Sequence, residues 1–344
     1  MNYPEIGRIG CRLMVVGVGG GGINAVNRMI AVGLEGVEFA AFDRDQQMVH
    51  RAKAGVRLRI GRLGRGFPEQ PNQELGRVAA EESREDISLA LGKPDLVFIV
   101  AGLGGSTGTG ASQVVAEVAR QAGALTIGVF TLPLPFEKRR LGEAEKGIEK
   151  LYRLVDSLII VSGESLLQMV GQRRATMPEV YRLADDILRL AVQAITDLIT
   201  MPFPFAPQEF VELKHLVKGD GNTALVGMLG LGRASGRNRA VEAARQAVSS
   251  PLLEAPLEEA KNVMINITAR PDLAPDECKE ILRFIMAVTD PGATVVFGGN
   301  IDPHLEEEVR VTLIATGFDP KREIPFPARR GYGAFNAKVP HSTP

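Results

Sequence analysis

Tryptophan is absent from this 344-residue sequence, and aromatic residues make up only 5% of it, so aliphatic side chains must form the core. The only two cysteines, Cys11 and Cys278, match no disulfide or zinc spacing, which predicts reduced thiols in a cytoplasmic protein. No apolar run reaches membrane-spanning length, and the N-terminus lacks the apolar segment of a signal peptide. Because the net charge is −1, charge gives no reason to expect a nucleic-acid partner.

An alternation of strand-like and helix-like segments dominates the first half of the chain. The apolar runs predict strands at residues 13–18, 37–43, 96–101, 125–131 and 157–162. The helical spacings predict helices at residues 23–32, 71–91, 110–121 and 143–154. Continuous apolar strands with helices between them indicate an α/β fold with a parallel sheet covered on both faces.

The second half predicts a long helix followed by a smaller α/β unit. Apolar residues recur at helical spacing over 179–200, and a proline-containing loop follows at 201–210. Helices are expected at 237–248 and 275–289, and strands at 263–268, 294–299 and 309–316. We therefore predict a nucleotide-binding domain over 1–175, a central helix over 176–205, a C-terminal α/β domain over 206–320, and a flexible basic tail over 321–344.

Four consecutive glycines, Gly19 to Gly22, join the first predicted strand to the first predicted helix. With Gly17, they fit the G-x-G-x-x-G pattern, and Asp43 ends the next strand, where a ribose-binding acid is expected. This pattern alone is consistent with an NAD(P)-dependent oxidoreductase, or with a tight turn that binds nothing. The four scattered histidines and two cysteines offer no convincing catalytic group for that oxidoreductase.

A second glycine loop, AGLGGSTGTGAS at residues 101–112, again follows an apolar strand and opens a helix. Backbone N–H groups in such loops, together with a helix N-terminus, can converge on phosphate oxygens. One dinucleotide fold needs one such loop, so two of them favour a polyphosphate held from two sides. The P-loop pattern G-x-x-x-x-G-K-[ST] is absent from the sequence, which excludes a Walker-type site.

At these residues the sequence resembles the tubulin/FtsZ superfamily. The similar segments are GVGGGGINAVNRM, GLGGSTGTG, GRVAAEES, VDSLI, AVSSPLLE and RVTLIATGF, which occur in the family's order over roughly residues 10–320. The resemblance implies a GTPase domain, a long central helix and a C-terminal α/β domain. It also implies a GTP/GDP-binding cytoskeletal protein, with Mg²⁺, that assembles with itself head to tail in filaments.

The resemblance assigns nucleotide binding to a set of residues from both loops and from later segments. They are Gly19, Gly20, Gly21, Gly22, Asn24, Arg28, Asp45, Gly104, Gly105, Ser106, Thr107, Gly108, Thr109, Glu137, Arg140, Tyr181 and Asp185. Tyr181 stands where the family has a phenylalanine against guanine. An aspartate at 185 can accept from both N1–H and N2–H₂ of guanine, whereas adenine presents a different edge. Core packing for Tyr181 and a solvated charge for Asp185 are the alternatives.

The chain departs from the family in its acidic catalytic loop, which the next subunit of a filament supplies. The family's N-x-D-x-x-D becomes PQEFVEL, so Pro207 replaces the amide, and Glu209 and Glu212 replace the aspartates. These glutamates would orient the attacking water, and their extra methylene predicts slow, assembly-dependent hydrolysis. A non-hydrolysing GTP-binding scaffold is the alternative.

Two further departures concern the phosphates and the tail. Asp43–Arg44–Asp45 stands where the family has Asn-Thr-Asp beside the phosphates, which suggests altered nucleotide handling. The tail, 321–344, interleaves basic and aromatic residues and shows no clear adaptor peptide. It is a candidate contact to an anionic membrane surface or to an adaptor protein, and a strip packed on a neighbouring subunit is the alternative.

Overall fold

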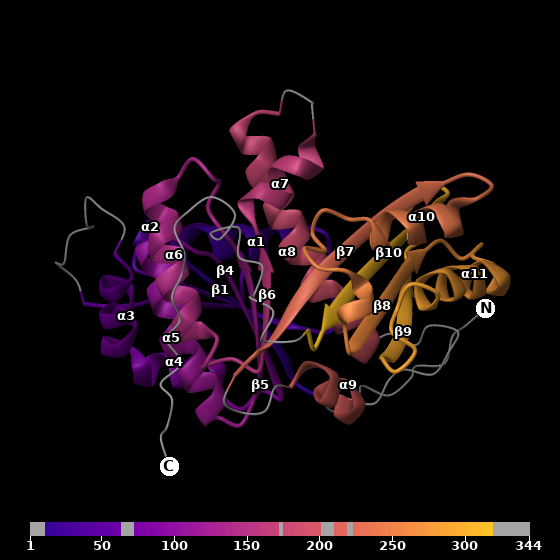
Figure 1. The fold of residues 1–344 in the computed structure, drawn as a ribbon. Helices are drawn as coiled ribbons and strands as arrows, with labels where there is room; N and C mark the ends of the chain where they lie inside the picture. The colour runs from indigo at the N-terminus through magenta and orange to yellow at the C-terminus, as the bar shows by residue number, and fades with distance from the viewer. Residues whose placement is uncertain (1–10, 63–71, 172–174, 201–209, 219–222, 319–344) are drawn as a thin grey trace, which may run out of the picture.

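The computed structural model describes residues 11–62, 72–171, 175–200, 210–218 and 223–318, with the backbone alone for 210–212. Ten strands of these residues form one sheet in the order β3-β2-β1-β4-β5-β6-β7-β10-β8-β9. Figure 1 shows the indigo-to-purple first half and the orange-to-yellow second half side by side, with the long strand β7 running between them.

The element bounds follow the chain order. The first half contains β1 Leu13–Val18, α1 Gly19–Ala31, β2 Glu38–Asp43, α2 Gln46–Arg51, β3 Val56–Arg59, α3 Gln73–Glu82, α4 Arg84–Leu91, β4 Leu96–Gly102, α5 Ser106–Gln121, β5 Leu125–Thr131, α6 Lys138–Leu151, β6 Ser157–Val161, α7 Gly163–Val170 and α8 Met177–Thr200. The second contains α9 Phe210–Val217, β7 Leu225–Ser235, α10 Arg239–Val248, a 3₁₀ turn Leu257–Glu259, β8 Asn262–Ala269, α11 Pro275–Met286, β9 Thr294–Ile301 and β10 Glu308–Thr316.

Strands β1 to β6 are all parallel, and helices cover both faces of this part of the sheet. Alternate residues of β1 face opposite ways, so Leu13 and Val15 pack with α1 and α8, whereas Met14 and Val16 pack with α4, α5 and α6. The predicted parallel sheet with two covered faces is confirmed.

The second half is a mixed sheet, in which β10 lies antiparallel between β7 and β8, and β9 is parallel to β8. Helices α10 and α11 pack on one face of it (Figure 1). The other face packs on α8, which buries residues such as Ile187 and Ile195 in the same core as Met264 and Ile314. Helix α8 therefore joins the cores of the two halves; the predicted domain boundaries stay a prediction.

Several elements differ from their predicted form. Helix α1 begins at Gly19 rather than at residue 23, and the single helix predicted over 71–91 is broken at Ser83 into α3 and α4. The sequence pattern does not predict strand β7, because its glycines interrupt the apolar run. Those glycines let α10 approach, since a Cβ at Gly230 or Gly232 would lie 2.4 or 1.9 Å from a carbonyl oxygen of α10.

Candidate functional site

The two glycine loops lie beside each other at one edge of the sheet. Strands β1 and β4 are adjacent and parallel, so their carboxyl ends meet at the same edge, and α1 and α5 begin there. The backbone bends at Gly19 and Gly104, whose φ angles of 73° and 92° lie in the left-handed region that favours glycine. The N-termini of α1 and α5 therefore lie at the same edge of the sheet, where their helix dipoles and free N–H groups favour a bound anion.

Close packing explains some of the glycines in these loops. A Cβ at Gly19 would lie 2.8 Å from the backbone nitrogen of Gly108, and one at Gly22 would lie 2.2 Å from the carbonyl oxygen of Val100. Side chains at these positions would push α1 away from β4 and α5. These glycines are therefore required by the fold, whatever the loops bind.

Packing does not explain Gly20 and Gly105. A Cβ at Gly105 would meet nothing within 4 Å, and one at Gly20 would touch only the flexible end of Met48 at 3.4 Å. Gly105 has φ −94° and ψ 164°, which other residues also adopt. Open space over bare backbone at both loops is the arrangement that lets phosphate oxygens approach the N–H groups.

The hydroxyl side chains of the second loop have different surroundings. Thr109 is fully buried, and its Oγ1 accepts the Gly104 N–H at 2.8 Å, so this side chain holds the loop in shape. The Oγ of half-buried Ser106 accepts the Asn72 N–H at 3.0 Å, which ties the start of α3 to this loop. Thr107 is half-buried at the N-terminus of α5.

The end of β2 adds a carboxylate turn at the same edge. Asp45 caps α2 by accepting the Gln47 N–H at 2.8 Å, and Asp43 accepts the Asp45 N–H at 2.9 Å. Burial raises the pKa of Asp43. Hydrogen bonds from the backbone N–H groups of Asp45 and Arg44 oppose this shift without cancelling it. A carboxylate that is 4% exposed and used by its own turn is poorly placed to bind a ribose, which disfavours the dinucleotide interpretation.

The start of α6 lies against the second loop. Glu137 forms an ion pair with Arg140 at 2.5 Å and accepts the Leu134 N–H at 3.0 Å. A Cβ at Gly104 would lie 2.6 Å from the carbonyl oxygen of Arg140, so the two segments are in contact. The structure therefore brings Glu137 and Arg140 to the loop, although they lie some thirty residues further along the chain.

Helix α8 packs beside α1, the helix that begins at the first glycine loop. Arg28 of α1 donates to both carboxylate oxygens of Asp186 on α8, at 2.7 and 2.9 Å, which fixes the two helices together. Tyr181 is 45% exposed, and Asn24 is also exposed, so the phenol ring and the amide are both accessible there. Burial and the neighbouring Asp186 raise the pKa of Asp185 to about 7, while Arg28 lowers it.

Sequence reasoning missed Asp186, because nothing local marks it as the partner of a residue 158 positions away.

The acidic loop cannot be placed: Glu209 and Pro207 lie outside the described residues, and Glu212 belongs to α9 but its side chain is not described. The tail residues 321–344 also lie outside the described residues. Within the described part, no three His, Cys, Asp or Glu side chains cluster in a way that could hold a metal ion.

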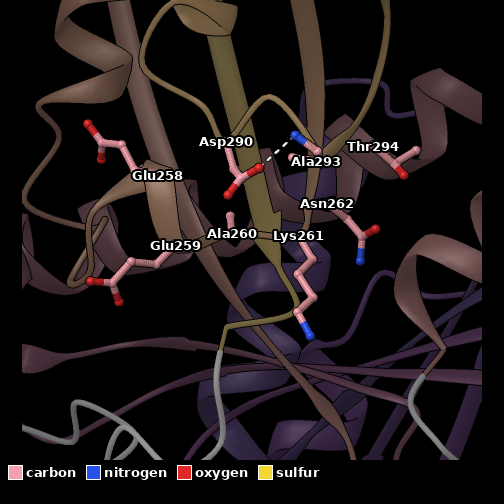
Figure 2. Close-up of a pocket in the computed structure, with 9 residues that line it drawn as sticks. Glu258, Glu259, Ala260, Lys261, Asn262, Asp290, Ala293 and Thr294 are labelled. Carbon is pink, nitrogen blue, oxygen red and sulfur yellow. Dashed lines mark hydrogen bonds between the residues drawn. The ribbon is translucent and has the colours of Figure 1, made fainter.

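A separate open pocket of about 720 Å³ lies where β8 and β9 begin, in the second half of the chain. Figure 2 shows two of its acidic side chains, Glu258 and Glu259, pointing away from Lys261 and Asn262, whereas the third, Asp290, accepts the Gly292 N–H of its own turn at 2.6 Å. Its polar groups therefore do not converge on one point. The glycine-loop edge, where two helix N-termini and several polar side chains meet, is the stronger candidate for the functional site.

Comparisons with known proteins agree with the α/β fold and identify a family. The family described as "Tubulin/FtsZ family, GTPase domain" matches residues 12–171, and "FtsZ family, C-terminal domain" matches residues 226–319. An empty FtsZ dimer from M. jannaschii is 36% identical, with a TM-score of 0.83 over 89% of this chain and 88% of that one.

A second FtsZ structure from M. jannaschii, that of a point mutant, is also 36% identical, with a TM-score of 0.84 over 90% of this chain and 92% of that one. CetZ2 from Haloferax volcanii, solved as a GTPγS-bound protofilament, is 18% identical, with a TM-score of 0.71 over 90% of this chain and 93% of that one. At that identity it supports the fold alone. No helix in the described part of the chain is long and apolar enough to cross a membrane.

Proposed function

Because the chain belongs to the tubulin/FtsZ family of GTPases, we propose that it binds GTP across the two glycine loops and polymerises head to tail. The observation that carries this proposal is the pair of helix N-termini packed side by side, with open space over Gly20 and Gly105. Both helix dipoles and the exposed N–H groups would stabilise the triphosphate. The family assignment confirms the resemblance seen in the sequence and argues against the oxidoreductase alternative.

The base and the sugar would be held by the later segments of the site. Asp185, as a carboxylate, would accept both N1–H and N2–H₂ of guanine, and Tyr181 would stack on the base. Asn24 would contact the nucleoside, and Glu137 the ribose. Arg140 would lie near the phosphates or the sugar, held there by its ion pair with Glu137.

Arg28 and Thr109 would act indirectly. The Arg28–Asp186 ion pair would keep α1 against α8, and the Thr109 hydroxyl would keep Gly104 in place. Gly19, Gly21, Gly22, Ser106, Thr107 and Gly108 would complete the phosphate cradle around Gly20 and Gly105. Mg²⁺ would be held mainly by phosphate oxygens and water, with the Asp45 carboxylate at the same edge of the sheet as the loops, which suits a cation that keeps much of its hydration.

Hydrolysis would need a neighbouring subunit. Glu209 and Glu212 of one subunit would orient the water that attacks the terminal phosphate bound by the next, so polymerisation and turnover would be coupled. Their longer side chains make slow turnover the expected result. The related FtsZ from M. jannaschii, solved as a dimer, supports self-association. A cytoplasmic location, and a membrane or adaptor contact through residues 321–344, stay predictions.

The test is GTP turnover measured at rising concentrations of the full chain. Activity per chain should rise with concentration, and Glu209→Ala or Glu212→Ala should lower it roughly a hundredfold or more without weakening GDP binding. Glu280→Ala, on the exposed face of α11, is the matched control and should leave turnover unchanged. Activity per chain that is independent of concentration would contradict the coupled mechanism.

Light scattering separates the proposal from the scaffold alternative. A polymerising GTPase should assemble with GTP and then disassemble as the nucleotide is consumed, whereas a slowly hydrolysed analogue should keep it assembled. Identical, lasting scattering with both nucleotides would favour the non-hydrolysing scaffold.

A further inference from the structure

A small basic cavity lies beside the candidate nucleotide site, between the ends of β2 and β3 and helix α3. Its volume is about 80 Å³, which is room for several water molecules. Among its lining residues are three arginines and one acid, together with two apolar residues of α3. They are Arg44, Arg59, Arg62, Glu82, Leu75 and Ala79.

Charge makes this cavity suited to an anion. The lining includes three arginines and one glutamate, so it carries an excess of positive charge even though Arg44 and Glu82 each already take part in another interaction. In the residues that the structure describes, no carboxylate lies within ion-pair distance of the side chains of Arg59 or Arg62. Guanidinium groups bind tetrahedral oxyanions through paired N–H donors, and hydrogen bonds of this kind are among the strong ones in proteins.

The walls of the cavity are held in place by the fold. The chain turns at Gly61, where a Cβ would lie 2.8 Å from that of Ala79, and the Gly61 N–H donates to the Ser83 hydroxyl at 3.0 Å. The next N–H, that of Arg62, donates to Glu82 at 3.0 Å. Strand β3 pairs with β2 up to Arg59, and the backbone of Arg62 is held to Glu82 at the end of α3, so the backbone positions of both arginines are set by the fold.

We propose that this cavity binds one phosphate-type oxyanion. Arg44 directly follows β2 at the edge where both glycine loops open, and α3 is tied to the second loop through the Ser106 hydroxyl. The anion could therefore be the terminal phosphate of a bound nucleotide or free orthophosphate next to it. Both present the same chemistry to the three arginines.

The test measures orthophosphate binding to the nucleotide-free full chain by isothermal titration calorimetry. We expect saturable binding, weakened roughly tenfold or more by Arg59→Gln and unchanged by Arg57→Gln, an exposed arginine of the same strand that does not line the cavity. Should Arg59→Gln fail to fold by circular dichroism, Arg62→Gln takes its place. No saturable binding, or equal weakening in the Arg57→Gln control, would overturn the proposal.

A further variant separates this site from the proposed nucleotide cradle. Gly105→Ala should leave orthophosphate binding intact. If Gly105→Ala lost orthophosphate binding while Arg59→Gln kept it, the anion would lie in the glycine loops and the proposal would be overturned. The source is settled by loading the protein first. If the cavity takes the terminal phosphate, orthophosphate should bind the GDP-loaded protein but not the protein loaded with a slowly hydrolysed GTP analogue. If it takes free orthophosphate, both forms should bind it alike.

Discussion

Lowering the pH from 8 to 6 is expected to weaken guanine-nucleotide binding roughly tenfold through a single side chain, Asp185. Burial and the adjacent Asp186 raise its pKa to about 7, with Arg28 opposing the shift. Only the carboxylate form can accept both N–H groups of the guanine edge, so the observed affinity should follow the ionised fraction. That fraction falls from about nine-tenths at pH 8 to about one-tenth at pH 6, which corresponds to roughly 1.4 kcal/mol.

The assay is equilibrium binding of GDP, which avoids hydrolysis, at pH 6, 7 and 8. The terminal phosphate of the ligand also titrates near pH 6, so the wild type is compared with Asp185→Asn, which keeps the size of the side chain but cannot ionise. The variant should bind more weakly at pH 8 and show only the dependence that belongs to the phosphate. An equal pH dependence in the two proteins would refute the assignment of Asp185 to the guanine edge.

Two further predictions concern a loop glycine and a buried acid. Gly105→Ala should leave the free energy of unfolding within about 1 kcal/mol of wild type, because its Cβ meets no atom within 4 Å. The same change should weaken GDP binding roughly tenfold or more, because the methyl group would block a phosphate. Gly55→Ala, at an equally open glycine, should change neither stability nor binding. Asp197→Asn should stabilise the fold at pH 8. Burial raises the pKa of Asp197 to about 7, although the hydrogen bond from Asn266 opposes this shift. Ionisation of Asp197 therefore costs the folded state free energy as the pH rises from 4 to 7, and asparagine removes that cost. Urea unfolding should show a gain of roughly 1–4 kcal/mol at pH 8 that vanishes near pH 4, and a gain of the same size at both pH values would contradict the burial argument.

Much of the fold was readable from local pattern. Apolar strands alternating with amphipathic helices predict the parallel sheet, because the periods of two and 3.6 residues are properties of short segments. The glycine loops were equally visible, because consecutive glycines between an apolar run and an amphipathic run are a feature of a short segment. Strand β7 was not, because glycines such as Gly230 serve a contact with α10 that no local pattern reveals.

What the sequence by itself determined is the order of the elements, the two glycine loops and the family, because each depends on residues that are close along the chain. Only the tertiary structure decided which glycines serve packing and which lie open, that Arg28 reaches Asp186, and that Asp185 titrates near neutrality. It also gathered Arg44 and Arg59 around one cavity. Burial and electrostatic interaction depend on distances between elements that meet only after folding, so they cannot be summed from neighbours in the chain.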